Sequence, residues 1–161
     1  MNCGEKCVIS LDLLRGEMMK MLNGIYRHSL DAKGRMAVPA KFRTELGDKF
    51  YVTRGDSNCL FIFSSQEWVK FNEAIRSSLS FRESLKISRH FNAFAFDVEP
   101  DSQGRIILPQ ELRNIAGIDR QAVVVGASSH AEVWSPEKWE ASNNSISEDD
   151  VLDILEKINF I

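Results

Sequence analysis

One supersecondary unit occurs twice in this sequence. D-A-K-G-R-M-A-V-P-A-K-F-R at residues 31–43 aligns without gaps, at an offset of seventy residues, with D-S-Q-G-R-I-I-L-P-Q-E-L-R at residues 101–113. With one added residue, F-S-S-Q-E-W at 63–68 also aligns with W-S-P-E-K-W at 134–139. Because self-similarity at a fixed spacing is the signature of a repeated structural unit, the chain is predicted to contain two pseudo-symmetric modules.

Each copy begins with a pattern that predicts a β-hairpin. A strand of alternating polarity, at residues 25–30 or 94–98, runs into D-x-x-G, whose Asp and Gly suit a type I turn. The predicted return strand covers residues 35–38 in the first copy and 105–108 in the second.

A short helix is predicted next in each copy, over residues 39–46 and 109–116. Each begins with a proline, which fits the first turn of a helix because it lacks an N–H. We expect Gly47 and Gly117 to end these helices in the left-handed conformation.

Two apolar runs then predict a second hairpin in each copy: residues 50–53 with 60–63, and residues 122–125 with 132–134.

Further helices follow the second hairpins. Ser64 with Glu67 predicts a capping box, for a helix that continues to about Leu79, and Ser135 with Pro136 starts its counterpart. We expect large apolar side chains that recur in both copies to form the core rather than stack on bases; they are Phe42, Leu112, Trp68, Trp139 and Trp134.

Ser147 is predicted to cap a last helix. Val151, Ile154, Leu155 and Ile158 recur in it at i, i+3, i+4 and i+7, so one apolar stripe requires a partner surface.

Composition restricts the class of protein. The chain of 161 residues is 43% hydrophobic and 27% charged, which is typical of a soluble globular protein. Asp12, Arg15 and Glu17 interrupt the segment where a signal peptide needs an apolar core, and no apolar run is long enough for a membrane span. The odd number of cysteines, three, argues against a disulfide framework and favours the cytoplasm.

Charge is distributed unevenly along the chain. Residues 21–54 hold seven basic and three acidic side chains, a net charge of +4, whereas residues 132–161 hold two and eight, a net charge of −6. The overall charge of −3 therefore hides a basic segment suited to a polyanion, although the acidic end also fits a solvated helix.

Catalysis is not predicted. His28, His90 and His130 are isolated from one another in the sequence, and nucleophile, zinc and phosphate-loop motifs are absent. We expect no enzyme activity, no cofactor, no metal site and no small-molecule substrate.

The paired D-x-x-G-R motifs, closed by V-V-V-G and E-V-W-S-P-E-K-W, resemble those of the MraZ family over about residues 21–158. The resemblance implies a β-rich α+β fold of two tandem AbrB-like swapped-hairpin β-barrel modules with short flanking helices. It also implies a ring-shaped homo-oligomer, associated with the nucleoid. The implied activity is that of a sequence-specific DNA-binding transcriptional regulator, chiefly a repressor, of repeated boxes upstream of the division and cell wall gene cluster.

The resemblance also divides the chain. Residues 1–20 have no counterpart, and Arg15-Gly16-Glu17 can be encoded by a purine-rich run where a ribosome-binding site for Met21 would lie. We therefore hypothesise that residues 1–20 are an N-terminal extension from a mis-assigned translation start. The remaining divisions are a first module at 21–80, a linker at 81–92, a second module at 93–142 and a C-terminal amphipathic helix at 143–161.

The candidate DNA-binding residues cluster around the two turns. The turn itself explains Asp31, Gly34, Asp101 and Gly104, but it does not require Arg35 or Arg105. An arginine there either pairs with the aspartate across the turn or presents its donors to guanine or phosphate, and both can hold together.

The other candidates are basic side chains near the first turn. Lys33 lies at its tip where the second copy has neutral Gln103, so the first copy is the expected electrostatic anchor. Further phosphate contacts, or a solvated surface, are expected of Arg27, His28, Lys41 and Arg43.

Two alternatives to a DNA-binding ring remain. The acidic C-terminal helix would capture a partner protein in an antitoxin-like interaction module, or the ring would be purely structural. A DNA-binding ring would sum several weak contacts through effective concentration.

Overall fold

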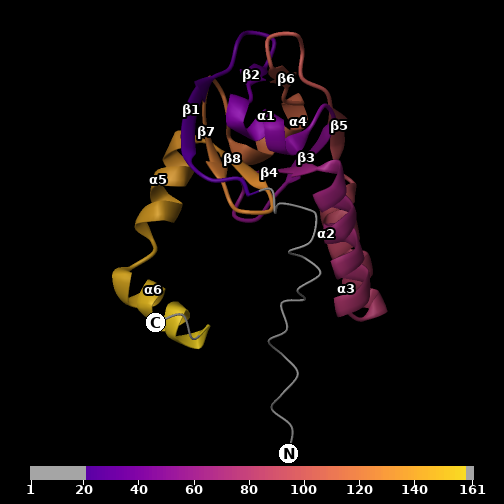
Figure 1. Ribbon diagram of the computed structural model, residues 1–161, viewed down its shortest axis with the longest axis vertical. Coiled ribbons are helices and arrows are strands. Elements are labelled where there is room, and N and C mark those ends of the chain that lie inside the picture. Colours follow the sequence, from indigo (N-terminus) through magenta and orange to yellow (C-terminus); the bar gives the residue numbers. More distant parts are fainter. Residues whose placement is uncertain (1–20, 159–161) are drawn as a thin grey trace, which may run out of the picture.

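The computed structural model describes residues 21–158, which form eight strands and six helices (Figure 1). The strands are β1 (Ile25–Ser29), β2 (Arg35–Ala37), β3 (Phe50–Arg54), β4 (Leu60–Ser64), β5 (Phe96–Val98), β6 (Arg105–Ile107), β7 (Gln121–Gly126) and β8 (Ala131–Trp134). The helices are α1 (Ala40–Leu46), α2 (Ser65–Ser78), α3 (Phe81–Asn92), α4 (Gln110–Ala116), α5 (Pro136–Asn144) and α6 (Glu148–Lys157). The fold is therefore mixed α+β, as predicted, and the hypothesis about residues 1–20 lies outside the described residues.

The strands form a six-stranded antiparallel sheet in the order β1-β7-β8-β4-β3-β5 and a separate two-stranded ribbon, β2-β6. The pairs β3-β4 and β7-β8 are the predicted second hairpins of the two copies, and both are confirmed.

The predicted first hairpin of each copy forms only at its turn. The Asp31 N–H donates to the Arg35 carbonyl, the Asp101 N–H donates to the Arg105 carbonyl, and Leu30 bridges Met36. The strands on either side of each turn pair with the other copy instead, so the predicted pairing of those strands is wrong. β1 pairs with β7, so that Tyr26 faces Val124, and β5 pairs with β3. β2 and β6 pair with each other, with Met36 facing Ile106. This exchange places strands from both copies over one shared core, in which these two side chains are 0% and 1% exposed.

The predicted closed barrels are also wrong for the described part of the chain. β1 and β5 are the two edges of the large sheet and do not pair with each other. Closure is not needed to bury the apolar face, because α1 and α4 contribute Phe42 and Leu112 to the core between sheet and ribbon, and both are fully buried. The burial of Phe42 and Leu112 confirms the prediction that they belong to the core. Trp68 is also buried, as predicted, and stacks on Tyr51 with 5.5 Å between the ring centroids.

The short helices start and end close to the predicted residues. Pro39 and Pro109 lie just before α1 and α4, as their N-caps, rather than inside the first turn. Gly117 is left-handed, with φ 67° and ψ 31°, whereas Gly47 has φ 85° and ψ −168° and so misses the left-handed helical region.

The Ser64 cap of α2 is half of the predicted capping box. The Ser64 hydroxyl oxygen accepts a hydrogen bond from the Glu67 N–H at 3.2 Å. The Glu67 carboxylate instead pairs with Lys70 at 2.8 Å, one turn further along the helix.

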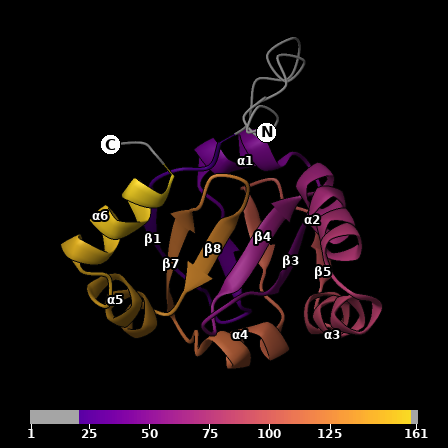
Figure 2. The same cartoon turned by 90° about the horizontal axis from the view of Figure 1, so that it is seen from below.

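The elements are arranged around an approximate twofold axis. Seen from below the sheet, α2 and α3 lie on one side and α5 and α6 on the opposite side, with α1 and α4 on the remaining two (Figure 2). The 31–35 and 101–105 turns meet at one end of the molecule, and α3 and α6 reach the other end (Figure 1). Between residues 21 and 158 no helix has the length and apolar character that a bilayer crossing requires.

Candidate nucleic-acid interface

Each D-x-x-G turn is closed by its own aspartate. In the first copy the Gly34 N–H donates to the Asp31 carbonyl at 2.9 Å, and Asp31 Oδ1 accepts from the N–H groups of Lys33 and Arg35, each at 2.9 Å. The second copy repeats these bonds, with Asp101 accepting from Gln103 and Arg105 at 2.9 Å. Asp and Gly are therefore structural requirements of the turn, as the sequence predicted.

The same aspartates hold the arginine side chains. Arg35 Nε donates to Asp31 Oδ2 at 2.6 Å, and Arg105 Nε donates to Asp101 Oδ2 at 3.0 Å. The pKa of both carboxyls lies below the ordinary value of 3.8, chiefly because the backbone N–H of Arg35 or Arg105 donates a hydrogen bond to the carboxylate. The guanidinium of the same arginine and the backbone N–H of Lys33 or Gln103 lower it further. Both carboxylates are therefore charged at neutral pH and fix one edge of each guanidinium.

The other edge of each guanidinium is available to a ligand. Within residues 21–158 no hydrogen-bond partner contacts the Nη atoms of Arg35 or Arg105, and these side chains are 32% and 30% exposed. Two parallel N–H donors in this arrangement match the O6 and N7 acceptors of guanine or two phosphate oxygens.

The β2-β6 register places both arginines on the same face. Arg35 lies opposite Ile107, and Ala37 lies opposite Arg105. Side chains directly opposite each other share a face of an antiparallel pair, and Met36 and Ile106 on the other face are buried. An exposed two-stranded ribbon with arginines on its outer face has the dimensions that enter the major groove.

Each turn rests on an arginine from the other copy. Gly34 has φ 75°, and a Cβ atom there would lie 2.8 Å from Arg113 Cζ. Gly104 has φ 73°, and its Cβ would lie 2.7 Å from Arg43 Nε and closer still to Cζ. Only glycine permits both the backbone conformation and this approach.

Backbone hydrogen bonds tie the two turns together below the tips. The Val38 N–H donates to the Gly104 carbonyl, and the Leu108 N–H donates to the Gly34 carbonyl, each at 3.0 Å. Arg113 Nε donates to the Leu108 carbonyl at 3.0 Å, whereas Arg43 Nε is buried and has no hydrogen-bond partner within residues 21–158. The two turns therefore form one unit built by both copies.

Arg113 is a residue of this unit that the sequence prediction missed. In the repeat alignment Arg113 corresponds to Arg43, which was predicted, so the alignment could have identified Arg113 as well. The structure puts both side chains beneath the turns.

The remaining predicted residues occupy different places. Lys33 is exposed at the tip of the first turn. Arg27 in β1 pairs with Glu140 of α5 at 2.8 Å, and Lys41 donates to Asn23 Oδ1 at 2.5 Å. Burial lowers the pKa of His28, which is therefore neutral at pH 7. No hydrogen bond or ion pair of the described residues joins Arg27, His28 or Lys41 to the turns.

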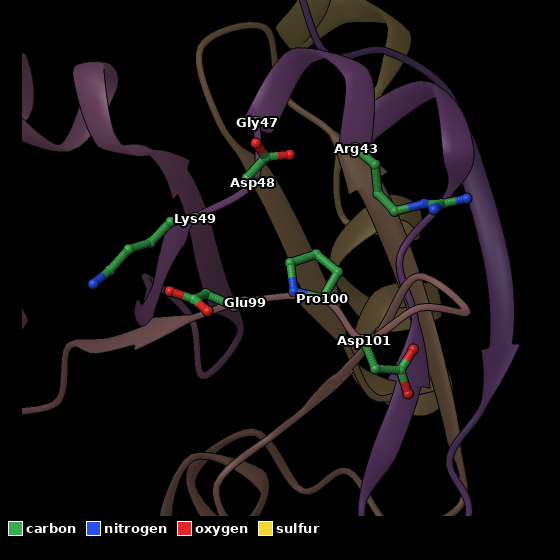
Figure 3. Close-up of a pocket in the computed structure, with 7 residues that line it drawn as sticks. All are labelled: Arg43, Gly47, Asp48, Lys49, Glu99, Pro100 and Asp101. Carbon is green, nitrogen blue, oxygen red and sulfur yellow. The ribbon is translucent and has the colours of Figure 1, made fainter.

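A cleft of about 500 Å³ borders the second turn (Figure 3). Its lining residues are Arg43, Gly47, Asp48, Lys49, Glu99, Pro100 and Asp101. Charges of both signs line it, and Lys49 is already paired with Asp97 at 2.7 Å. Small-molecule sites are lined mostly by apolar side chains, whereas charged side chains predominate in the lining of this cleft. Within the part of the chain that the structure describes, no three His, Cys, Asp or Glu residues are grouped to hold a metal.

Comparison with known proteins identifies relatives over both copies. A family model described as "MraZ protein, putative antitoxin-like" matches residues 21–89 and again 91–157. The chain is 40% identical over 142 residues to the transcriptional regulator MraZ of Thermoanaerobacter pseudethanolicus, covering 86% of this chain and 99% of that protein. It is 44% identical over 133 residues to that of Lachnoclostridium phytofermentans, covering 83% and 94%.

A third relative is also a transcriptional regulator MraZ. The transcriptional regulator MraZ of Natranaerobius thermophilus is 46% identical over 121 residues, covering 74% of this chain and 85% of the relative. These matches confirm the resemblance found in the repeats, and the family is one of transcriptional regulators rather than enzymes. Because the family model covers most of the chain in two successive matches, the chain belongs to the MraZ family.

Proposed function

We propose that this protein is a DNA-binding transcriptional regulator that places the outer face of the β2-β6 ribbon in the major groove. The observation that carries this proposal is the pair of arginines on that face, each held at Nε by an aspartate and free at Nη within the described residues. Arg35 and Arg105 are the proposed base-reading groups, because a bidentate arginine discriminates guanine from the other bases.

The distribution of charge supports this orientation. The basic turns and the acidic helix α6 lie at opposite ends of the molecule (Figure 1), and Glu148, Asp149 and Asp150 open that helix. Helix α6 therefore repels a polyanion and leaves the basic side chains of the turns as the proposed contact surface. Lys33, at the tip of the first turn, is the proposed phosphate contact, with Arg27, His28, Lys41 and Arg43 as further candidates.

Assembly into a homo-oligomeric ring is the second part of the proposal. The α6 stripe is open to solvent in the single chain, with Val151 42%, Ile154 56% and Ile158 62% exposed. Covering this stripe with another copy would stabilise an oligomer, and several ribbons on one assembly would bind repeated boxes with increased effective concentration.

Finer features of the proposal follow the family resemblance. They are a swapped-hairpin origin for the exchanged strands, the module boundaries 21–80 and 93–142, and a cytoplasmic, nucleoid-associated repressor of boxes upstream of the division and cell wall gene cluster. The exchange of β1, β2, β5 and β6 between copies supports the first of these.

Gel shift with the DNA upstream of the protein's own gene tests the site. Arg35→Ala and Arg105→Ala should each weaken binding by about 1 to 3 kcal/mol, the range for loss of a bidentate base contact. Arg82→Ala is the matched control, because it removes an exposed arginine from α3 at the far end of the molecule.

Size-exclusion chromatography must show the same assembly for every variant. If the double variant Arg35→Ala, Arg105→Ala binds DNA as well as the control while its assembly persists, the ribbon is not the DNA-binding site. That result would favour the protein-interaction alternative.

A further inference from the structure

An exposed isoleucine interrupts the charged outer face of the ribbon. Ile107 is 60% exposed, although Ile106 beside it on the same strand is 1% exposed and faces the core. The equivalent position in the first copy is Ala37, which has little side chain to expose. The large apolar group on this face is therefore specific to the second copy.

The surroundings of Ile107 restrict what can cover it. It lies directly opposite Arg35 in the ribbon, and Arg105 lies two residues away on the same face of the same strand. A partner must therefore offer acceptors for two guanidinium groups and an apolar group between them. The major groove offers this combination, because guanine presents O6 and N7 and thymine presents its C5 methyl group.

The spacing agrees with neighbouring base pairs. Residues directly opposite in an antiparallel pair have Cβ atoms about 4.5 to 5.5 Å apart, and successive base pairs are separated by about 3.4 Å. The longer Arg35 side chain and the compact Ile107 side chain can thus reach adjacent or next-but-one base pairs.

We propose that Ile107 is a specificity-determining residue that contacts the methyl group of a thymine close to the base pair bound by Arg35. The inference rests on the proposed function and extends it to the base composition of the site. At the pseudo-equivalent position, opposite Arg105, Ala37 is too short to make this contact, so only one half of the ribbon site selects thymine.

Replacement of single thymines by deoxyuridine tests the proposal, because it removes only the methyl group. The full chain is titrated against fluorescent duplexes of its own upstream DNA, each with one thymine replaced, and the Kd is measured by anisotropy. One thymine in each box should show about a fourfold loss of affinity, the effect expected for burial of one methyl-sized group.

The Ile107→Ala variant should bind the thymine and deoxyuridine duplexes equally at that position, while it keeps its dependence on Arg35. Ile146→Ala is the matched control, because Ile146 is 59% exposed and lies between α5 and α6. It should retain the full sensitivity to deoxyuridine.

Three results would overturn the inference. In the first, no replacement of thymine by deoxyuridine weakens binding of the unaltered protein, or Ile107→Ala remains sensitive to that replacement. If Arg35→Ala still weakens binding, the proposed function then stands without this contact. In the second, Ile107→Ala lowers the mass of the assembly by light scattering and weakens all duplexes equally, which identifies a contact between copies. In the third, Arg35→Ala and Arg105→Ala have no effect, and the proposed function fails together with the inference.

Discussion

Replacement of Gly104 by alanine should destabilise the protein more than replacement of any left-handed glycine that lacks a close neighbour. Gly104 has φ 73°, where a residue with a Cβ atom costs about 1 to 2 kcal/mol. Its Cβ would also lie 2.7 Å from Arg43 Nε, so the guanidinium must leave its site beneath the turn. Because these atoms are the end of a flexible side chain that is only half-buried, the displacement should cost about 1 kcal/mol, the lower limit for overpacking, and the expected total is about 2 to 3 kcal/mol.

Gly117→Ala is the matched control. Gly117 has a similar φ of 67°, but an added Cβ would meet only the flexible end of Lys138, with Nζ at 3.3 Å. The expected cost is therefore only the backbone part, about 1 to 2 kcal/mol. Urea unfolding followed by tryptophan fluorescence measures both free energies, at one protein concentration because assembly contributes to the apparent stability.

A double-mutant cycle isolates the contribution of Arg43. In an Arg43→Ala background the steric part disappears, so Gly104→Ala should cost only the backbone part, about 1 to 2 kcal/mol. The packing of the second turn on Arg43 would be refuted if Gly104→Ala cost the same in both backgrounds, or no more than Gly117→Ala.

Further predictions concern the assembly and the latch, by which we mean the ion pairs of Asp31 with Arg35 and of Asp101 with Arg105. The pKa values of Asp31 and Asp101 lie below 3.8, so their stabilisation of the turns is complete above that pH and is lost only as pH falls below it; carboxyl NMR midpoints at or above 3.8 would contradict this. Asp31→Asn removes the charge that holds Arg35, so it should weaken DNA binding in gel shifts without dissociating the assembly, and unchanged affinity would argue against the latch. Ile154→Asp places a charge on the exposed α6 stripe and should lower the assembly mass measured by light scattering, whereas Lys157→Asp, outside the stripe, should not. Insertion of half a helical turn between two boxes should abolish their cooperation, and equal binding to in-phase and out-of-phase templates would argue against a ring.

Local signals predicted the elements that depend on local chemistry. The Asp31 turn forms because its side chain accepts from N–H groups two and four residues ahead, which requires no distant partner. Ser64 and Ser147 mark the starts of α2 and α6 for the same reason. The apolar runs of β3 and β4 were identifiable because a short turn-rich segment joins them.

The exchange between copies could not be predicted from these signals. The two copies carry nearly the same pattern, so Met36 satisfies one apolar position whether its strand pairs within its own copy or with Ile106. The burial of Met36 and Ile106 in one core decides which strands pair, and this burial is a property of the whole fold. The positions of Arg113 beneath Gly34 and of Ile107 opposite Arg35 depend on that exchange and were therefore also hidden.

Two copies in one chain give the ribbon an approximate twofold symmetry and also the freedom to depart from it. In a dimer of identical hairpins every change in one strand appears in the other, and the ribbon binds equally well in two directions. Here Lys33 corresponds to Gln103 and Ala37 to Ile107, so the two halves of the ribbon differ in charge at the tip and in apolar contact at the centre. The phosphate contact proposed for Lys33 would add about −0.9 to the dependence of log K on log salt, on one side only. With these proposed contacts, the ribbon would bind DNA in its two directions with unequal free energy. A ring whose subunits share one orientation should then prefer boxes that repeat in the same direction.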